Sequence, residues 1–277
     1  MTSFIPRSLP PHDGLVIALH CSGAGAGQWR QLGTALAPHF NLRAPEHFGT
    51  ESAGPWCGTH AFTLADEAAT SIGLIDAVDG LVHLVGHSYG GGVALRVALE
   101  RPHRIASLTL YEPSAFYLLA GLGEAGDQAR REILGVVRTT AEGVVTGDYA
   151  SAARHFVDYW NGSGAWNALR PDIRAALTRW LPKAPLDFRA LLDEPTPLSA
   201  YRDFRFPVLV LRGEHAPRPT RVAAEALADA VPSARLIAID GAGHMGPITH
   251  AADVNRHIVA HIAKAAGVDR HTGTIAA

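Results

Sequence analysis

The chain has 277 residues, of which 47% are hydrophobic, and its 24 basic and 26 acidic side chains give a formal net charge of −2. This length and apolar content allow one α/β domain with a large core, and the near-neutral charge argues against a polyanionic partner such as nucleic acid. Two cysteines, Cys21 and Cys57, are too few for a disulfide framework, and residues 1–7 lack the pattern of a signal peptide, so we expect a cytoplasmic protein without a membrane-spanning segment.

Apolar runs and helix-like segments alternate through most of the chain. Continuous apolar runs bounded by turn residues are typical of strands that are covered on both faces of a parallel sheet. The predicted strands are residues 15–19, 42–45, 81–85, 107–111, 207–211 and 235–239. The predicted helices lie around residues 29–36, 63–75, 89–101, 221–230 and 254–262. Strands separated by helices indicate an α/β fold, with a mostly parallel, doubly wound sheet.

Residues 114–203 interrupt this alternation and are predicted to form several helices joined by loops. We therefore predict a core of residues 1–113 and 204–277, with a helical cap of residues 114–203 at the carboxyl ends of the strands, where ligands bind in such sheets. The cap is rich in aromatic side chains, which more often form the core of such an insertion than a binding surface. Trp29, Phe116 and Trp160 are the candidate substrate-binding residues.

The turn Gly86-His87-Ser88-Tyr89-Gly90 lies where the predicted strand 81–85 passes into a helix. Its pattern, G-x-S-x-G, is typical of a sharp strand-to-helix turn that holds its central residue in a strained conformation, with only glycine fitting on either side. The alternative is a chance glycine–serine turn, but the strand before it and the helix after it favour a nucleophile elbow. We therefore predict that Ser88 is an exposed nucleophile at the carboxyl edge of the sheet.

A serine hydroxyl needs a general base, and the base needs a group that orients it. The chain has 15 histidines, so their number alone carries no information. His244 is distinctive because Asp240-Gly241-Ala242-Gly243 joins it directly to the last predicted strand, and the glycines allow a tight loop that can bring it to the edge where Ser88 lies. We predict that His244 is the base and that His87, inside the turn, is structural.

His257 and His261 have the spacing of two metal ligands on one helix face, but no third ligand is evident. We therefore predict no metal site and no cofactor. An oxyanion formed at Ser88 would need hydrogen-bond donors. The backbone N–H of Tyr89, at a helix N-terminus, is one candidate, and the N–H of Ser22, after the first predicted strand, is the second, with Cys21 as its alternative.

Three motifs in this order resemble the α/β-hydrolase fold superfamily. They are His20-Cys21-Ser22-Gly23 with Trp29, then Gly86-His87-Ser88-Tyr89-Gly90-Gly91, then Gly241-Ala242-Gly243-His244-Met245-Gly246-Pro247. The resemblance spans residues 15–263 and implies that the cap is inserted after the family's sixth strand. The family usually opens with a β-hairpin. Only 14 residues precede Leu15 here, so we expect that hairpin to be shortened or absent.

The resemblance leaves two carboxylates as the third member of a triad. Most members of the superfamily carry an aspartate three residues beyond the glycine that ends the seventh strand, but that position after Gly213 is Ala216 here. Some members carry the acid directly after the sixth strand instead, where this chain has Glu112. We predict Glu112 as the acid, because it could reach the far ring nitrogen of His244 and hold its tautomer, with Glu214 as the alternative.

These residues together predict a serine hydrolase that acts through a Ser-His-acid triad and an acyl-enzyme on a small-molecule substrate, a fairly apolar ester or related carbonyl compound. Carbon–carbon bond hydrolysis, lactone opening and acyl transfer on the same triad are the alternatives within this fold. The alternative to an enzyme is a protein of this fold that binds a small molecule without catalysis.

Overall fold

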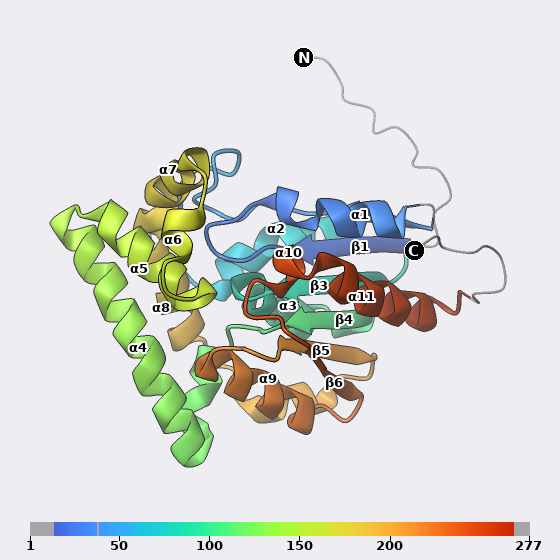
Figure 1. The fold of residues 1–277 in the computed structure, drawn as a ribbon. Helices are drawn as coiled ribbons and strands as arrows, with labels where there is room; N and C mark the ends of the chain where they lie inside the picture. Colours follow the sequence, from blue (N-terminus) through green and yellow to red (C-terminus); the bar gives the residue numbers. More distant parts are fainter. Residues whose placement is uncertain (1–13, 38, 269–277) are drawn as a thin grey trace, which may run out of the picture.

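The computed structural model of the protein describes residues 14–37 and 39–268. Six strands form one parallel sheet in the order β2-β1-β3-β4-β5-β6 (Figure 1). They are β1 (Gly14–Leu19), β2 (Phe40–Arg43), β3 (Val82–His87), β4 (Ile105–Tyr111), β5 (Val208–Gly213) and β6 (Ala234–Ile239). The predicted doubly wound α/β fold is confirmed. The predicted loss of an N-terminal hairpin concerns residues 1–13, which lie outside the described residues.

Alternate side chains of the strands enter two hydrophobic cores, one on each face of the sheet. Ile17 and Leu19 of β1 pack on one face, whereas Val16 and Ala18 pack on the other. The first face is covered by α2, α3 and α9, and the second by α1 and α11. The helices of the sheet layers are α1 (Arg30–Leu36), α2 (Leu64–Asp76), α3 (Tyr89–Glu100), α9 (Arg218–Ala230), α10 (Gly246–Thr249) and α11 (Ala251–Ala266). The strands therefore read as continuous apolar runs because both of their faces are covered.

Five further helices lie between β4 and β5 in the sequence, beyond the carboxyl edge of the sheet (Figure 1). They are α4 (Gly123–Thr146), α5 (Tyr149–Asn161), α6 (Ala165–Ala168), α7 (Pro171–Trp180) and α8 (Ala184–Asp193). The described residues also contain short 3₁₀ helices: η1 (Ala26–Trp29), η2 (Pro102–Arg104), η3 (Phe116–Gly121), η4 (Leu181–Lys183) and η5 (Leu198–Asp203). Trp180 and Leu181 form a small separate core within this block, whereas Trp160 and Phe188 join the main core. The division into core and cap stays a prediction.

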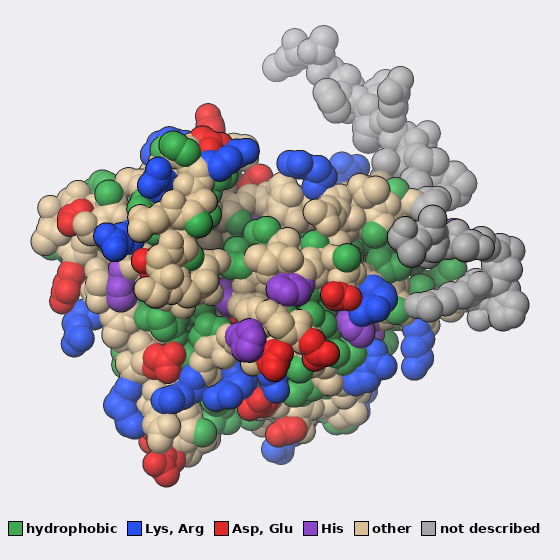
Figure 2. Space-filling model, viewed as in Figure 1, with side chains coloured by type: hydrophobic (Ala, Val, Ile, Leu, Met, Phe, Trp, Pro, Cys, Tyr) green, Lys and Arg blue, Asp and Glu red, His purple; other side chains and the backbone are tan. Residues whose placement is uncertain are grey.

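Local signals in the sequence account for individual element boundaries. Thr63 caps α2 by accepting a hydrogen bond from the Asp66 amide, and the Asp66 side chain accepts one from the Thr63 amide, which together form a capping box. Acidic and basic side chains are interspersed over the face shown in Figure 2. Within residues 14–37 and 39–268, no helix combines the length and the apolar character needed to cross a membrane.

Candidate active site

Ser88 lies in the sharp turn between β3 and α3, with a backbone φ of 55° and ψ of −118°. A positive φ is strained for a serine, and such strain persists only where the surroundings enforce it. A Cβ atom on Gly86 would lie 2.5 Å from the Gly90 carbonyl oxygen, and one on Gly90 would lie 2.3 Å from the carbonyl oxygen of Leu19. The turn therefore requires both glycines. Ser88 is only 6% exposed, so it is not the solvent-exposed residue that the sequence predicted.

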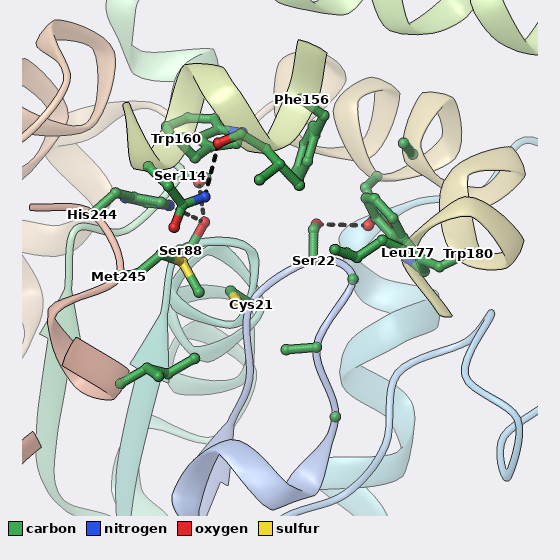
Figure 3. A pocket seen from close by; sticks show the side chains of 18 of the residues that line it. Cys21, Ser22, Ser88, Ser114, Phe156, Trp160, Leu177, Trp180, His244 and Met245 are labelled. Atoms are coloured by element: carbon green, nitrogen blue, oxygen red, sulfur yellow. Dashed lines mark hydrogen bonds between the residues drawn. The ribbon is translucent and has the colours of Figure 1, made fainter. Parts of the chain in front are cut away.

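His244 lies in the loop that follows β6 and faces Ser88 (Figure 3). Its Nε2 atom is 2.9 Å from the Ser88 Oγ atom, and its Nδ1 atom is 2.7 Å from the Glu112 Oε2 atom. The indole ring of Trp160 covers the imidazole, with the ring centroids 4.3 Å apart. The histidine is 3% exposed. The imidazole is thus fixed between a hydroxyl and a carboxylate, the arrangement that proton transfer from a serine requires.

Glu112 follows β4 directly and has a strained backbone φ of 42°. Its carboxylate is fully buried and accepts two hydrogen bonds besides that of His244. The amide of Gly213 donates to Oε1 at 2.9 Å, and the hydroxyl of Thr220 donates to Oε2 at 2.8 Å. A buried carboxylate needs such partners to remain charged. The carboxylate is therefore held in one orientation against the His244 ring.

Glu214 is exposed and contacts a different part of the same loop. Its Oε2 atom accepts a hydrogen bond of 2.8 Å from the backbone amide of Gly241, three residues before His244. Of the two candidate acids, the structure brings Glu112 to the imidazole, whereas Glu214 tethers the backbone of the loop.

Two backbone amides close to Ser88, those of Tyr89 and Ser22, donate no hydrogen bond among the described residues. Tyr89 is the first residue of α3, a position whose amide has no partner within the helix. The amide of Cys21 is occupied, because it donates to the Oε1 atom of Gln28 at 3.1 Å. Of the two alternatives in this loop, the Ser22 amide is therefore the one available to an oxyanion.

A cavity of about 630 Å³ opens above Ser88 and His244 and extends beneath α5, α7 and α8. Most of its lining is apolar, as the positions of Phe156, Leu177 and Trp180 in Figure 3 illustrate. The lining also includes Phe116 and Trp160, two of the three side chains proposed to contact substrate.

Trp29 does not line this cavity within the described residues. Its side chain is 1% exposed and packs with Leu32 and Ile258 in the core on the other face of the sheet. The predicted substrate-binding role is therefore wrong for Trp29. The indole leaves η1 toward the interior, between the sheet and the helices α1 and α11, and its role is in packing.

Ser114 contacts Ser88 and was not foreseen from the sequence. Its Oγ atom is 3.2 Å from the Ser88 Oγ atom, and its amide donates to the Ser88 carbonyl oxygen at 3.0 Å (Figure 3). The signal that could have found it is its place two residues after Glu112, where the chain leaves the same sheet edge.

A buried ion-pair cluster, formed by Glu67, Lys183 and Asp187, supports the site from α2, η4 and α8. The Lys183 ammonium is 3.0 Å from Glu67 Oε2 and contacts Asp187 Oδ1. Asp187 Oδ2 accepts a 2.7 Å hydrogen bond from the Ser22 hydroxyl, and Glu67 Oε2 accepts one of 2.7 Å from the Tyr89 hydroxyl. Burial lowers the pKa of Lys183, but the two carboxylates outweigh it and raise that pKa above its usual value. The cluster therefore holds both residues whose amides are candidate oxyanion donors.

Metal chemistry has no evident site in the described part of the chain. No group of three or more histidine, cysteine, aspartate or glutamate side chains within it is arranged to hold a metal ion. The pair His257 and His261 on α11 accordingly lacks a third ligand there.

Comparisons with known proteins agree with this fold. A family model described as the alpha/beta hydrolase family matches residues 16–257. The pimeloyl-(acyl-carrier protein) methyl ester esterase of Aromatoleum aromaticum is 28% identical over 248 residues, which cover 86% of this chain and 94% of that protein. A thermophilic esterase from Thermogutta terrifontis superposes with a TM-score of 0.69 at 21% identity, covering 91% of this chain and 90% of the other. An enol-lactonase from Burkholderia xenovorans LB400 gives 0.68 at 17%, covering 90% and 91%. The chain therefore belongs to the alpha/beta hydrolase family.

Proposed function

We propose that the protein is a serine hydrolase of the carboxylesterase type that cleaves a small, fairly apolar ester. The observation that carries this proposal is the continuous hydrogen-bonded series from Ser88 through His244 to Glu112 at the floor of an apolar cavity. The contacts among these three side chains are the ones that a nucleophile, a base and an acid need for acyl transfer, which supports the proposal. The relative named as a methyl ester esterase supports an ester as the substrate.

In the proposed reaction, the Ser88 hydroxyl attacks the ester carbonyl carbon while His244 Nε2 takes its proton. Glu112 accepts the hydrogen on Nδ1, which keeps Nε2 free as the acceptor and stabilises the imidazolium that forms. The amides of Tyr89 and Ser22 donate to the negative oxygen of the tetrahedral intermediate. His244 then protonates the leaving alkoxide. His244 then takes a proton from a water molecule, whose oxygen attacks the acyl carbon, and returns that proton to Ser88 Oγ as the carbon–Oγ bond breaks and the carboxylic acid leaves.

The substrate class follows from the lining of the cavity. Its walls are formed mainly by apolar side chains of the segment that we propose as a cap, residues 114–203. Burial of apolar surface favours binding by about 25 cal/mol per Å². A substrate with an apolar acyl or alcohol group is therefore expected to bind better than a charged one of equal size.

A fluorophosphonate probe tests this proposal, because it reacts with an activated serine and not with a merely structural one. Wild-type protein should be labelled, and Ser88→Ala should abolish the labelling. Ser114→Ala is the matched control, since it removes a neighbouring hydroxyl and should leave labelling of Ser88 in place. Hydrolysis of p-nitrophenyl acetate, butyrate and octanoate then reports the preferred acyl length. Folded wild-type protein that stays unlabelled would refute the enzyme and favour a small-molecule-binding protein.

A further inference from the structure

A series of three hydrogen bonds runs through His87, the residue before Ser88, and joins the loop after β1 to the loop after β6. The Cys21 amide donates to Gln28 Oε1 at 3.1 Å. Gln28 Nε2 lies 3.1 Å from His87 Nδ1, and His87 Nε2 lies 2.9 Å from the backbone carbonyl oxygen of His244. One end of the series is therefore the loop that carries Ser22, and the other end is the backbone of the proposed base.

The chemistry of these groups allows only one assignment of donor and acceptor in each hydrogen bond of the series. The carbonyl oxygen of His244 can only accept, so His87 Nε2 must carry the hydrogen. In a neutral imidazole Nδ1 is then an acceptor, and Gln28 must present its amide nitrogen to it. The remaining Gln28 oxygen accepts from the Cys21 amide, which can only donate. Each contact fixes the next, and every polar atom in the series is satisfied.

His87 remains neutral in this position. It is fully buried, and burial lowers its pKa well below the usual value, with a further lowering by the nearby charge of His244. His87 therefore keeps the same tautomer when His244 becomes an imidazolium in the proposed reaction, and it does not compete for the proton of Ser88.

The oxyanion end of the series fixes a peptide plane. The Cys21 carbonyl oxygen accepts from the Ala24 amide at 3.2 Å and lies 2.8 Å from His20 Nδ1. This carbonyl and the Ser22 N–H belong to one planar trans peptide, so they point in opposite directions. Gln28 holds the Cys21 amide, and the Ala24 amide and His20 hold the Cys21 carbonyl oxygen. The orientation of the Ser22 N–H is therefore fixed.

We propose that His87 and Gln28 are positioning residues, which hold the proposed base His244 and the proposed oxyanion donor Ser22 in a fixed relation across the elbow. This inference rests on the proposed hydrolase function. It assigns a role to the variable residue within G-x-S-x-G, which packing alone does not explain, because an apolar side chain would fill the same buried volume without leaving polar atoms to satisfy.

Gln28→Leu tests the oxyanion end, since Gln28 is partly exposed on a 3₁₀ turn and its loss should leave the fold intact. Gln31→Leu, the same change at an exposed position of α1, is the matched control. Misplacing a catalytic donor by about 1 Å can cost about a hundredfold in rate. We expect Gln28→Leu to lower kcat for a p-nitrophenyl ester about ten- to hundredfold with little change in KM. Its affinity for a boronic acid that forms a tetrahedral adduct should weaken in parallel.

His87→Asn tests the base end. The asparagine oxygen can still accept from Gln28, but its NH₂ group lies nearer the backbone than His87 Nε2 and cannot reach the His244 carbonyl oxygen at the same time. We expect a similar fall in kcat. The kcat loss of the double variant with Gln28→Leu should be smaller than the product of the two single losses, because both changes act on one series of hydrogen bonds. In wild-type protein, ¹⁵N NMR should show His87 as the neutral Nε2–H tautomer.

The outcomes separate this inference from the function on which it rests. If wild-type protein shows no labelling or turnover that depends on Ser88, the hydrolase function fails. If wild-type protein is active but Gln28→Leu keeps the kcat and boronic acid affinity of Gln31→Leu, the positioning role is overturned. An Nδ1–H tautomer for His87 would overturn it as well. Should His87→Asn fail to fold, Gln28→Leu and the NMR measurement still decide the question.

Discussion

Replacing Glu112 with glutamine should nearly abolish hydrolysis while leaving the fold in place. The substitution keeps the size of the side chain and exchanges one oxygen for an NH₂ group. Gly213 donates to one oxygen, so the glutamine oxygen is best placed there and the NH₂ group faces His244 Nδ1. Both groups would then offer a hydrogen, unless His244 moves its own hydrogen to Nε2. In that tautomer Nε2 can no longer accept the proton of Ser88.

The expected magnitude follows from this change of tautomer. The carboxylate-to-amide change in a serine–histidine–acid triad lowers kcat about 10⁴-fold. That corresponds to about 5 kcal/mol of transition-state stabilisation. The Glu112 carboxylate accepts from the Thr220 hydroxyl as well as from His244 on the same oxygen. In the glutamine variant this hydroxyl would also face the NH₂ group. We therefore expect a loss of about 10³- to 10⁴-fold in kcat.

Steady-state hydrolysis of a p-nitrophenyl ester measures the effect, with circular dichroism and Tm as checks that the variant is folded. Glu214→Gln is the matched control, because a glutamine oxygen can still accept from the Gly241 amide. We expect this control to stay within about threefold of wild type, the effect of a fraction of 1 kcal/mol. A folded Glu112→Gln variant with more than a tenth of wild-type kcat would refute the assignment, as would a loss of activity confined to Glu214→Gln.

Three further predictions concern stability and reactivity. Lys183→Met leaves two buried carboxylates without their cation and should lower the free energy of unfolding by about 3–5 kcal/mol in urea titrations. Lys264→Met, at an exposed lysine, should change that free energy little, and equal effects of the two variants would contradict a stabilising role for the buried ion-pair cluster. Burial lowers the pKa of His47 from 6.5 to about 4. As the pH falls, the unfolded chain therefore binds this proton before the folded protein does. The free energy of unfolding should fall by up to about 1.4 kcal/mol for each pH unit of acidification between pH 6.5 and about 4, and His47→Asn should reduce this slope. Burial raises the pKa of the Cys21 thiol to about 12, so iodoacetamide at pH 8 should modify exposed Cys57 and spare Cys21 until the protein unfolds; mass spectrometry decides.

The sheet and its order of elements could be predicted because each strand is apolar on both faces. No strand boundary shifts by more than two residues between pattern and structure, and β3 continues to His87 instead of ending at Val85. His87 therefore belongs to the strand end rather than to the turn. Ser88 and His244 could be placed near each other because the carboxyl ends of parallel strands share one edge. Their roles remain predictions that the labelling experiment tests.

The prediction of Glu112 over Glu214 as the acid rests on the family resemblance, because physical arguments from the sequence do not separate the two carboxylates. Glu112 and Glu214 both follow strands of the same sheet edge, and both carry a side chain long enough to reach the loop of His244. What separates them is backbone conformation, because Glu112 has a positive φ. Glutamate gives no advance signal for such a conformation, which the surrounding contacts must enforce.

The contacts that the segment 114–203 makes with the rest of the chain could not be predicted from the sequence, for another reason. Asp187 meets Ser22 across 165 positions of sequence, and this distance is closed only by the way in which α4 to α8 fold back over the sheet. Helical periodicity predicts which side of each helix is apolar, but it does not predict the packing partner. The ion-pair cluster was therefore missed, although Lys183 and Asp187 already stand four residues apart on one helical face.

The position of Glu112 explains how the proposed acid can stand on β4 without changing the geometry around His244. β4 and β5 are neighbours, and the Glu112 amide donates to the Leu211 carbonyl oxygen at 2.9 Å as the pairing of the two strands ends. From there the glutamate side chain crosses to the end of β5, where the Gly213 amide binds its carboxylate. An acid borne by the end of β5, the more common arrangement in this family, would approach the same region from the other strand. The requirement is thus a negative charge at His244 Nδ1, and either of two adjacent strand ends can supply it.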